Sequence, residues 1–77
     1  MRRIRDAQQR DWDVTVGRES FGMQVFLFLP ADGSETRKAL MHSDTWVEGE
    51  QELGSLAEEA LLERLAVSVR WEETASR

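Results

Sequence analysis

The stretch MQVFLFL, residues 23–29, is the most apolar part of the chain and decides the fold. It is too short to span a membrane, and its β-branched and aromatic side chains favour a strand. Successive side chains of a strand point to opposite faces, so Phe26 and Phe28 lie on one face and the valine and leucines on the other. A chain of 77 residues rarely has enough material to cover both faces. The surplus apolar side chains therefore indicate a contact rather than a reaction.

The flanking segments predict an antiparallel meander. DWDVTV, residues 11–16, alternates apolar and polar side chains, as expected of a half-buried strand. PADGS, residues 30–34, is the clearest turn, because proline lacks a ladder donor and Asp-Gly favours a tight reversal. ETRKALMH, residues 35–42, returns as an outer strand, and RRIR, residues 2–5, is a further short strand. We expect three or four strands.

The pattern after residue 42 is typical of a helix. Ser43 or Asp44 can cap its start, because both side chains accept hydrogen bonds from the first turn. TWVEGEQEL, residues 45–53, then places apolar side chains at helical spacing. Gly54 is expected to break or bend the chain.

A second helix is predicted within LAEEALLERLAVSV, residues 56–69. It begins either at the capping-box spacing of Ser55 and Glu58 or at position 57, although Ala57 is a poor cap. Whether the two helices are separate or form one bent helix stays open at this point, and residues 70–77 are interpreted as a flexible tail. The predicted fold class is α+β: a three- or four-stranded antiparallel meander followed by two C-terminal helices packed on one face.

The choice of covered face sets the predicted interface. We expect the helices to cover the larger apolar set, which comprises Trp12, Val14, Val16, Met23, Val25, Leu27, Leu29 and Leu40. Phe26 and Phe28 would then be exposed on the other face as an interaction patch. Three kinds of cover are considered for this patch: Phe21, Trp71 or the N-terminal arm of the same chain, a second copy, or a different partner.

Composition bounds the function. The chain has no cysteine and one histidine, His42, so thiolate and multi-histidine metal sites are excluded and no cofactor is expected. A single 77-residue domain without disulfides is commonly stabilised by oligomerisation. No apolar run follows the basic N-terminus directly, and no stretch approaches the length of a membrane span. We therefore expect a cytoplasmic homo-oligomer, specifically a dimer.

Charge is unevenly distributed along the chain. The net charge is −5, and no lysine or arginine occurs between Ala39 and Glu63. The predicted acidic helical surface comprises Glu48, Glu52, Glu59 and Glu63. Such a surface suits a basic protein partner, because charge complementarity steers association. The acidic balance argues against nucleic acid, whose phosphates are bound by lysine and arginine.

Candidate catalytic and ligand motifs are weak. His42-Ser43-Asp44 contains the residue types of a catalytic triad, but a triad is assembled from distant segments. The carboxylates of DWD, residues 11–13, and EGEQE, residues 48–52, do not follow the EF-hand pattern. GRESFG, residues 17–22, lacks the ending of a phosphate loop. We expect no catalytic residue and no metal site.

The segment RRIRDAQQRDWDVTVGRESFG, residues 2–22, together with ELGSLAEEALLERL, residues 52–65, resembles a loose group of short uncharacterised bacterial proteins. The resemblance implies no activity, cofactor or site residue. Leu62 departs from the charged position expected in such helices, which leaves open whether it is exposed or part of an interface.

These observations predict a non-enzymatic protein–protein interaction module that self-associates and contacts a partner through its acidic helices. The alternative is a small nucleic-acid-binding domain, in which arginines hold phosphates and aromatic rings stack on bases. Its candidate residues are Arg2, Arg3, Arg5, Arg10, Trp12, Phe26 and Phe28. The opposing interpretation is that these arginines pair with Asp6, Asp11 and Asp13.

Overall fold

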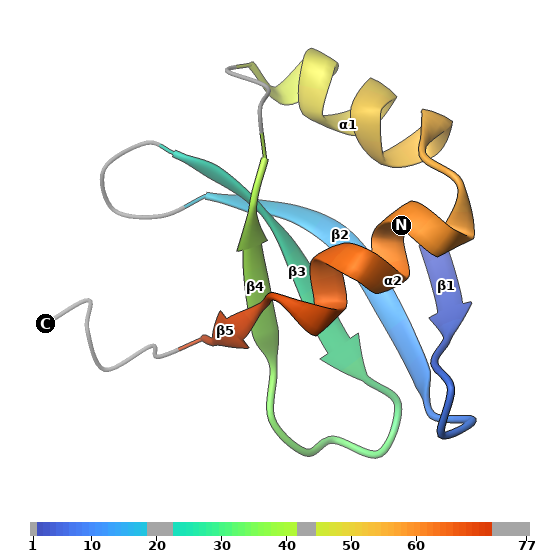
Figure 1. The fold of residues 1–77 in the computed structure, drawn as a ribbon. Helices are drawn as coiled ribbons and strands as arrows, with labels where there is room; N and C mark the ends of the chain where they lie inside the picture. Colours follow the sequence, from blue (N-terminus) through green and yellow to red (C-terminus); the bar gives the residue numbers. More distant parts are fainter. Residues whose placement is uncertain (1, 19–22, 42–44, 72–77) are drawn as a thin grey trace, which may run out of the picture.

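The computed structural model describes residues 2–18, 23–41 and 45–71, which form one antiparallel sheet with two helices on one face (Figure 1). The five strands lie in the order β1-β2-β3-β4-β5. They are β1 (Arg2–Arg5), β2 (Asp11–Arg18), β3 (Gln24–Pro30), β4 (Arg37–Leu40) and β5 (Val69–Arg70), and the helices are α1 (Trp46–Ser55) and α2 (Glu58–Ala66). The predicted α+β meander followed by two helices is confirmed, and the structure adds a short strand after the helices.

The helices cover the face that carries the phenylalanines. Phe26 pairs with Val16 and Phe28 pairs with Val14 across β2 and β3, so these four side chains share one face. All four are buried, as is Trp12 on the same face. The prediction is confirmed for Trp12, Val14 and Val16. It is wrong for Met23, Leu27, Leu29 and Leu40, which lie on or beside β3 and β4 and are exposed or half-buried. Val25 is fully buried as expected, although it lies on the face opposite the phenylalanines.

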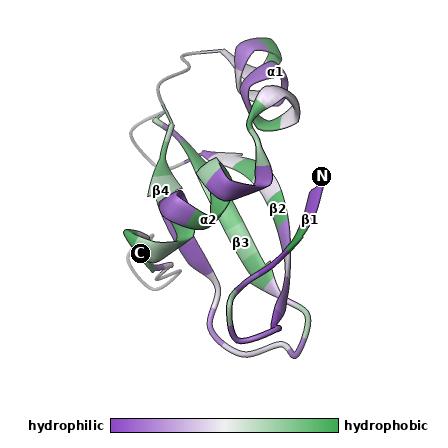
Figure 2. Ribbon diagram, turned by 45° about the vertical axis from the view of Figure 1, so that its right-hand side comes forward, coloured by the Kyte–Doolittle hydropathy of each residue, from purple (hydrophilic) through white to green (hydrophobic). Residues whose placement is uncertain are grey.

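Strand register explains this difference. Arg18 pairs with Gln24 at the ends of β2 and β3, and the pairing continues in step to Trp12 and Pro30. A shift by one residue would exchange the two faces of β3. The observed register encloses both rings under the helices, with their centroids 6.3 Å apart. Each ring removes more apolar area from water than a leucine does, which favours this register. Figure 2 shows β3 as a hydrophobic strand in the middle of the sheet.

Helix α1 packs against β2 and β3. Its N-cap is Thr45, whose hydroxyl accepts a hydrogen bond from the Glu48 N–H at 3.2 Å. The predicted cap at residue 43 or 44 is therefore wrong, and those two residues lie outside the described ranges. Gly49 faces the sheet: a Cβ added there would lie 3.2 Å from Gln24 Nε2 and 3.4 Å from Val16 Cγ1. The missing side chain lets the helix lie close to the strands.

Two residues in extended conformation, Leu56 and Ala57, separate the helices. Ala57 is the N-cap of α2 and makes no side-chain cap hydrogen bond. The start at position 57 is therefore confirmed, and the capping box from Ser55 is wrong. The end of α1 is instead held by β1, because Arg2 Nη1 donates to the Leu53 carbonyl at 3.1 Å and to the Leu56 carbonyl. The structure thus answers the open question: the two helices are separate.

Helix α2 lies across the sheet and packs against β1 and β4 (Figure 1). Leu61 on its inner side is fully buried, and Leu62 is half-buried and packs against the core. The chain then enters β5, where Val69 pairs with Lys38 and Arg70 with Arg37. Of the predicted tail, Arg70 lies in β5 and Trp71 hydrogen-bonds to Thr36, whereas residues 72–77 lie outside the described ranges. Neither helix is long and apolar enough to cross a membrane.

Candidate interaction surface

Phe26 and Phe28 do not form an exposed patch. Both side chains are fully buried in the core beneath the helices. The prediction that they form the interface is wrong, because the helices cover their face of the sheet. What remains uncovered by the helices is the opposite face, which is called the open face below.

The open face carries the apolar side chains that were expected inside. Cross-strand pairing places Thr15, Leu27, Lys38 and Val69 in one row and Gly17, Val25 and Leu40 in the next. Leu29 lies beside them, opposite Asp13. Val25 is fully buried on this face, but other side chains are exposed: Leu40 and Val69 at 56% each and Leu29 at 36%, with Met23 at 49% just before β3. Strands β3, β4 and β5 therefore present an apolar strip to solvent.

Gly17 shapes the middle of this strip. A Cβ added to Gly17 would lie 2.5 Å from Leu27 Cδ1 and 2.7 Å from Leu27 Cγ. The Leu27 side chain thus lies directly over the backbone of β2, in space that only glycine leaves open. Leu27 is half-buried in this position.

Charged side chains border the strip on the β1 side. Arg3 Nε lies 3.0 Å from Asp13 Oδ1, and Arg5 Nε lies 3.0 Å from Asp11 Oδ1. The hydrogen bonds from Arg3 lower the pKa of the Asp13 carboxyl, which is thereby kept ionised. The predicted pairing of the arginines with Asp11 and Asp13 is confirmed for these two.

On the opposite border, Lys38 Nζ lies 5.3 Å from the centre of the Trp71 ring, a cation–π distance. Backbone hydrogen bonding positions this ring, because the Trp71 N–H donates to the Thr36 carbonyl at 2.9 Å and thereby extends the ladder beyond Arg70. Trp71 is half-buried. It does not cover Phe26 or Phe28, because those rings point to the helices.

The residues proposed for nucleic-acid binding are engaged within the domain. Trp12 is buried, and its Nε1 donates to Asp6 Oδ2 at 3.0 Å. This bond and the backbone N–H of Arg10 lower the pKa of Asp6. The Arg10 guanidinium lies 4.9 Å from the Trp12 ring centre and 3.6 Å from Asp32. With both phenylalanines buried as well, these aromatic positions offer bases no exposed ring.

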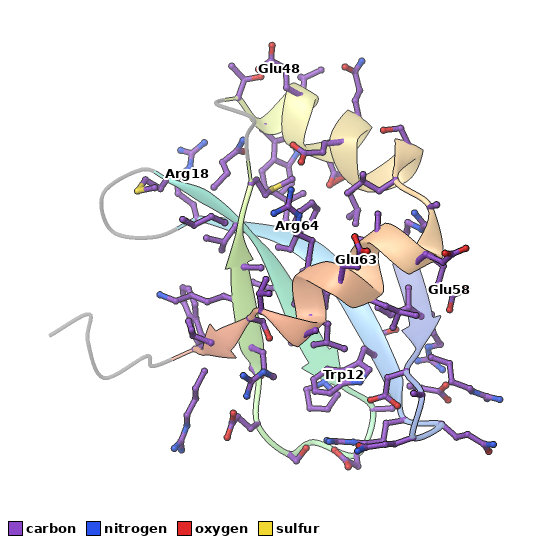
Figure 3. The ribbon with its side chains drawn as sticks, in the orientation of Figure 1. Trp12, Arg18, Glu48, Glu58, Glu63 and Arg64 are labelled. Atoms are coloured by element: carbon purple, nitrogen blue, oxygen red, sulfur yellow. The ribbon has the colours of Figure 1, made fainter. Side chains whose placement is uncertain are left out.

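The acidic residues on the helices are mostly exposed. Glu48, Glu59 and Glu63 are exposed, whereas Glu52 is half-buried. Each helix carries two of them four residues apart, which places them on one side of that helix. Figure 3 shows Glu48 at the start of α1 and Glu63 on α2, well apart. The structure therefore distributes the four residues over two helices rather than gathering them at one point.

The described part of the chain holds no cluster of metal-ligating side chains. No group of three or more histidine, aspartate or glutamate side chains there could hold a metal ion. His42 lies outside the described ranges, as does Phe21.

The exposed residues of the open face were missed because both faces of β3 are apolar. Alternation alone cannot decide between them. Side-chain size was a usable signal. The larger aromatic side chains of β3 favour the face that the helices cover, whereas leucines beside Thr15 and Gly17 can remain partly exposed to solvent. Comparisons of the chain with protein-family models, with curated proteins and with solved structures found no match.

Proposed function

We propose that this chain is a non-enzymatic protein–protein interaction module that forms a homodimer by packing its open face against the open face of a second copy. The observation that carries the proposal is the exposed apolar strip on β3, β4 and β5, opposite the helices. Exposed apolar patches bordered by polar residues are typical of interaction sites. Sheets stacked face to face bury such side chains in a layer about 10 Å thick.

The size of the open face bounds the strength of this dimer. The five strands hold 25 residues, and at about 3.3 Å per residue and 4.8 Å between strands they give an outline of about 400 Å². Side-chain relief makes the accessible area larger than the outline. Stable interfaces bury about 600–1,000 Å² on each partner. The open face therefore reaches the lower end of this range only with that relief, which corresponds to a weak, concentration-dependent dimer.

Charge also favours a second copy on this face. The described strands place three basic side chains (Arg3, Arg5 and Lys38) and two acidic ones (Asp11 and Asp13) on it. The chain as a whole carries −5. Two copies would thus meet through a nearly neutral surface, while the acidic helices stay on the outside of the dimer. Like-charge repulsion, which opposes association elsewhere on this chain, is smallest here.

The test is the solution mass by light scattering on a sizing column, from low to high micromolar concentration. We expect a dimer for the wild type and a monomer for Leu29→Asp, because the new carboxylate would be buried without a partner. Val47→Asp is the matched control: it makes the same kind of change at an exposed position on α1 and should stay dimeric. A monomeric wild type at every concentration would end the self-association proposal, and so would a dimeric Leu29→Asp.

We further propose that the acidic helical surface binds a basic segment of a partner protein, which would leave the open face available for the second copy. The support is the exposure of Glu48, Glu59 and Glu63 on the helical layer. A labelled deca-lysine peptide should bind the wild type more tightly than Glu59→Gln/Glu63→Gln, with an affinity that falls as salt rises. The control, Asp32→Asn/Glu35→Gln, removes the same charge outside the helices. Equal losses in both variants would mean that net charge alone explains the binding.

A further inference from the structure

The outer edge of β4 is only partly covered. Strand β5 has two residues, and its pairing with β4 reaches Lys38 but not Leu40. The Met41 N–H donates inward to the Gln24 carbonyl. Because backbone groups of a strand alternate between its two sides, the N–H and C=O of Leu40 point outward. Among the described residues, no strand lies against them.

The other edge of the sheet is treated differently. On β1, the Arg5 N–H donates outward to Glu58 Oε2 at 3.1 Å. A side chain from α2 thus satisfies an edge donor that would otherwise be open to another strand. Natural sheets commonly cover their edges in such ways. Among residues 2–18, 23–41 and 45–71, none protects the edge at Leu40 in this way, which makes it the better place for an added strand.

A groove of about 350 Å³ adjoins this edge. Its lining residues are Val25, Lys38, Ala39, Leu40, Arg64, Val67 and Val69. The lining includes two cations and no carboxylate, although acidic residues outnumber basic ones in the chain, 15 to 10. Its apolar part includes Leu40, Val67 and Val69, all of which are exposed. The groove therefore combines outward backbone groups, apolar walls and positive charge.

The wall at the end of α2 is held in place. Arg37 donates to Ser68 Oγ at 2.8 Å and to the Ser68 carbonyl at 2.7 Å. The Ser68 hydroxyl in turn donates to the Leu65 carbonyl at 2.6 Å. The link from α2 into β5 is thus tied to β4, beside which β5 lies (Figure 1). The groove is therefore closed at the end where β5 begins.

This closure limits what can bind. A strand added at Leu40 would meet β5 almost at once, so it must end there or turn away. A strand antiparallel to β4 runs in the direction of β5 and would end with its C-terminus against Val69. A parallel strand would end there with its N-terminus. The cations Lys38 and Arg64 favour a carboxylate over an ammonium group, which selects the antiparallel direction.

We propose that the groove between β4, β5 and the end of α2 binds the free C-terminus of an extended segment of another protein. The last residue is apolar and pairs with the backbone of Leu40, while its carboxylate faces Lys38 and Arg64. This site shares Lys38, Leu40 and Val69 with the open face, but it differs from the proposed dimer contact because its ligand is a chain end and its main contacts are backbone groups at the sheet edge.

The first experiment uses fluorescein-labelled hexapeptides that end in valine, leucine, isoleucine or phenylalanine, each as the free acid and as the C-terminal amide. Fluorescence polarisation with the full chain should show at least one acid that binds about tenfold more tightly than its amide, because a charged hydrogen bond is lost in the amide. Equal binding of acid and amide for all four endings, or no binding of any acid, would overturn the proposal.

The second experiment removes the outward donor. Leu40→Pro deletes the Leu40 N–H, a change that edge strands tolerate where this group faces solvent. It should weaken binding of the best acid about 3- to 10-fold relative to Leu40→Ala, which shortens the side chain but keeps the N–H. Equal affinities of the two variants would refute the backbone contact. If Leu40→Pro does not fold, titration of the wild type replaces it, and the Leu40 amide resonance must then shift with the acid peptide.

Charge provides the matched control. Arg64→Gln should weaken the acid peptide and leave the amide peptide unchanged, whereas Arg5→Gln, on the opposite edge strand β1, should change neither. The same loss in both variants would show that the peptide responds only to overall charge and would overturn the site. The remaining possible occupant of the edge is a second copy of the chain, and the solution mass of Leu40→Pro tests for it. If this variant loses the dimer and no acid peptide binds the wild type, the edge is a contact between copies.

Discussion

Two neighbouring residues of β3, Phe28 and Leu29, provide the sharpest test of the face assignment. Phe28 is fully buried beneath the helices, and Leu29 is 36% exposed on the open face. Phe28→Ala should lower the free energy of unfolding by about 3–5 kcal/mol, because it removes a ring and leaves a cavity. Leu29→Ala should cost only about 1 kcal/mol, because solvent fills the vacated space. A chain of this length has a total stability of roughly 4–12 kcal/mol, so the first loss approaches the whole.

The assay is urea unfolding followed by far-ultraviolet circular dichroism at low protein concentration, so that self-association does not contribute. If Phe28→Ala is unfolded in buffer, Phe28→Leu takes its place, with an expected loss of about 1–2 kcal/mol, still above that of the conservative change Leu29→Met. The argument for the register of β2 and β3 is refuted if Leu29→Ala costs as much as Phe28→Ala or more. Such a result would mean that the leucines, not the phenylalanines, lie under the helices.

Three further predictions concern residues that hold the N-terminal part of the domain. Arg2→Ala should lower the free energy of unfolding by about 1–3 kcal/mol, because Arg2 donates to two carbonyls at the end of α1; Arg3→Ala, which breaks an exposed ion pair, should change the urea midpoint far less. Asp6 has a lowered pKa in the folded chain, so its stabilising effect is present above the ordinary value of 3.8 and is lost as the pH falls below it. Asp6→Asn should therefore flatten the decline of the urea midpoint with acid, and an unchanged decline would argue against the Trp12 hydrogen bond. Gln9 has a φ of 65°, so Gln9→Gly should leave the thermal midpoint unchanged or raise it, and a clear decrease would show that the Gln9 side chain has a role.

Patterns within single segments predicted much of the fold. The alternation of DWDVTV gave the correct inward set on β2, because only one of its faces is apolar. The turn at residues 30–34 was equally clear, and Gly33 N–H donates to the Pro30 carbonyl at 3.1 Å. In both cases the local sequence is compatible with one structure only. For β3, either face could be directed toward the helices, and the choice depends on the pairing with β2, which cannot be predicted from a local pattern.

The remaining errors have similar causes. The cap of α1 lies at Thr45 rather than at Ser43 or Asp44, since three consecutive residues there can accept the same hydrogen bond. The start of α2 at Ala57 is set by tertiary contacts, including the Arg2 side chain on the Leu56 carbonyl, and not by its own cap. Strand β5 is only two residues long and has no recognisable pattern. The predicted interface was wrong for the same reason, because it depended on which face of β3 the helices cover.

The links between β1 and the helices have a consequence for folding. Every ladder in the sheet joins strands that are adjacent or separated only by the helical segment, so the first three hairpins close short loops and should form quickly. The hydrogen bonds of Arg2 to Leu53 and Leu56, and of the Arg5 N–H to Glu58, instead join residues 51 to 54 positions apart. We expect this closure to be the last step of folding and the first to reverse. Amide hydrogen exchange should then be faster at Arg5 than in the middle of β3. The reason is a partial opening in which β1 and the helices detach while the hairpin of β2 and β3 persists.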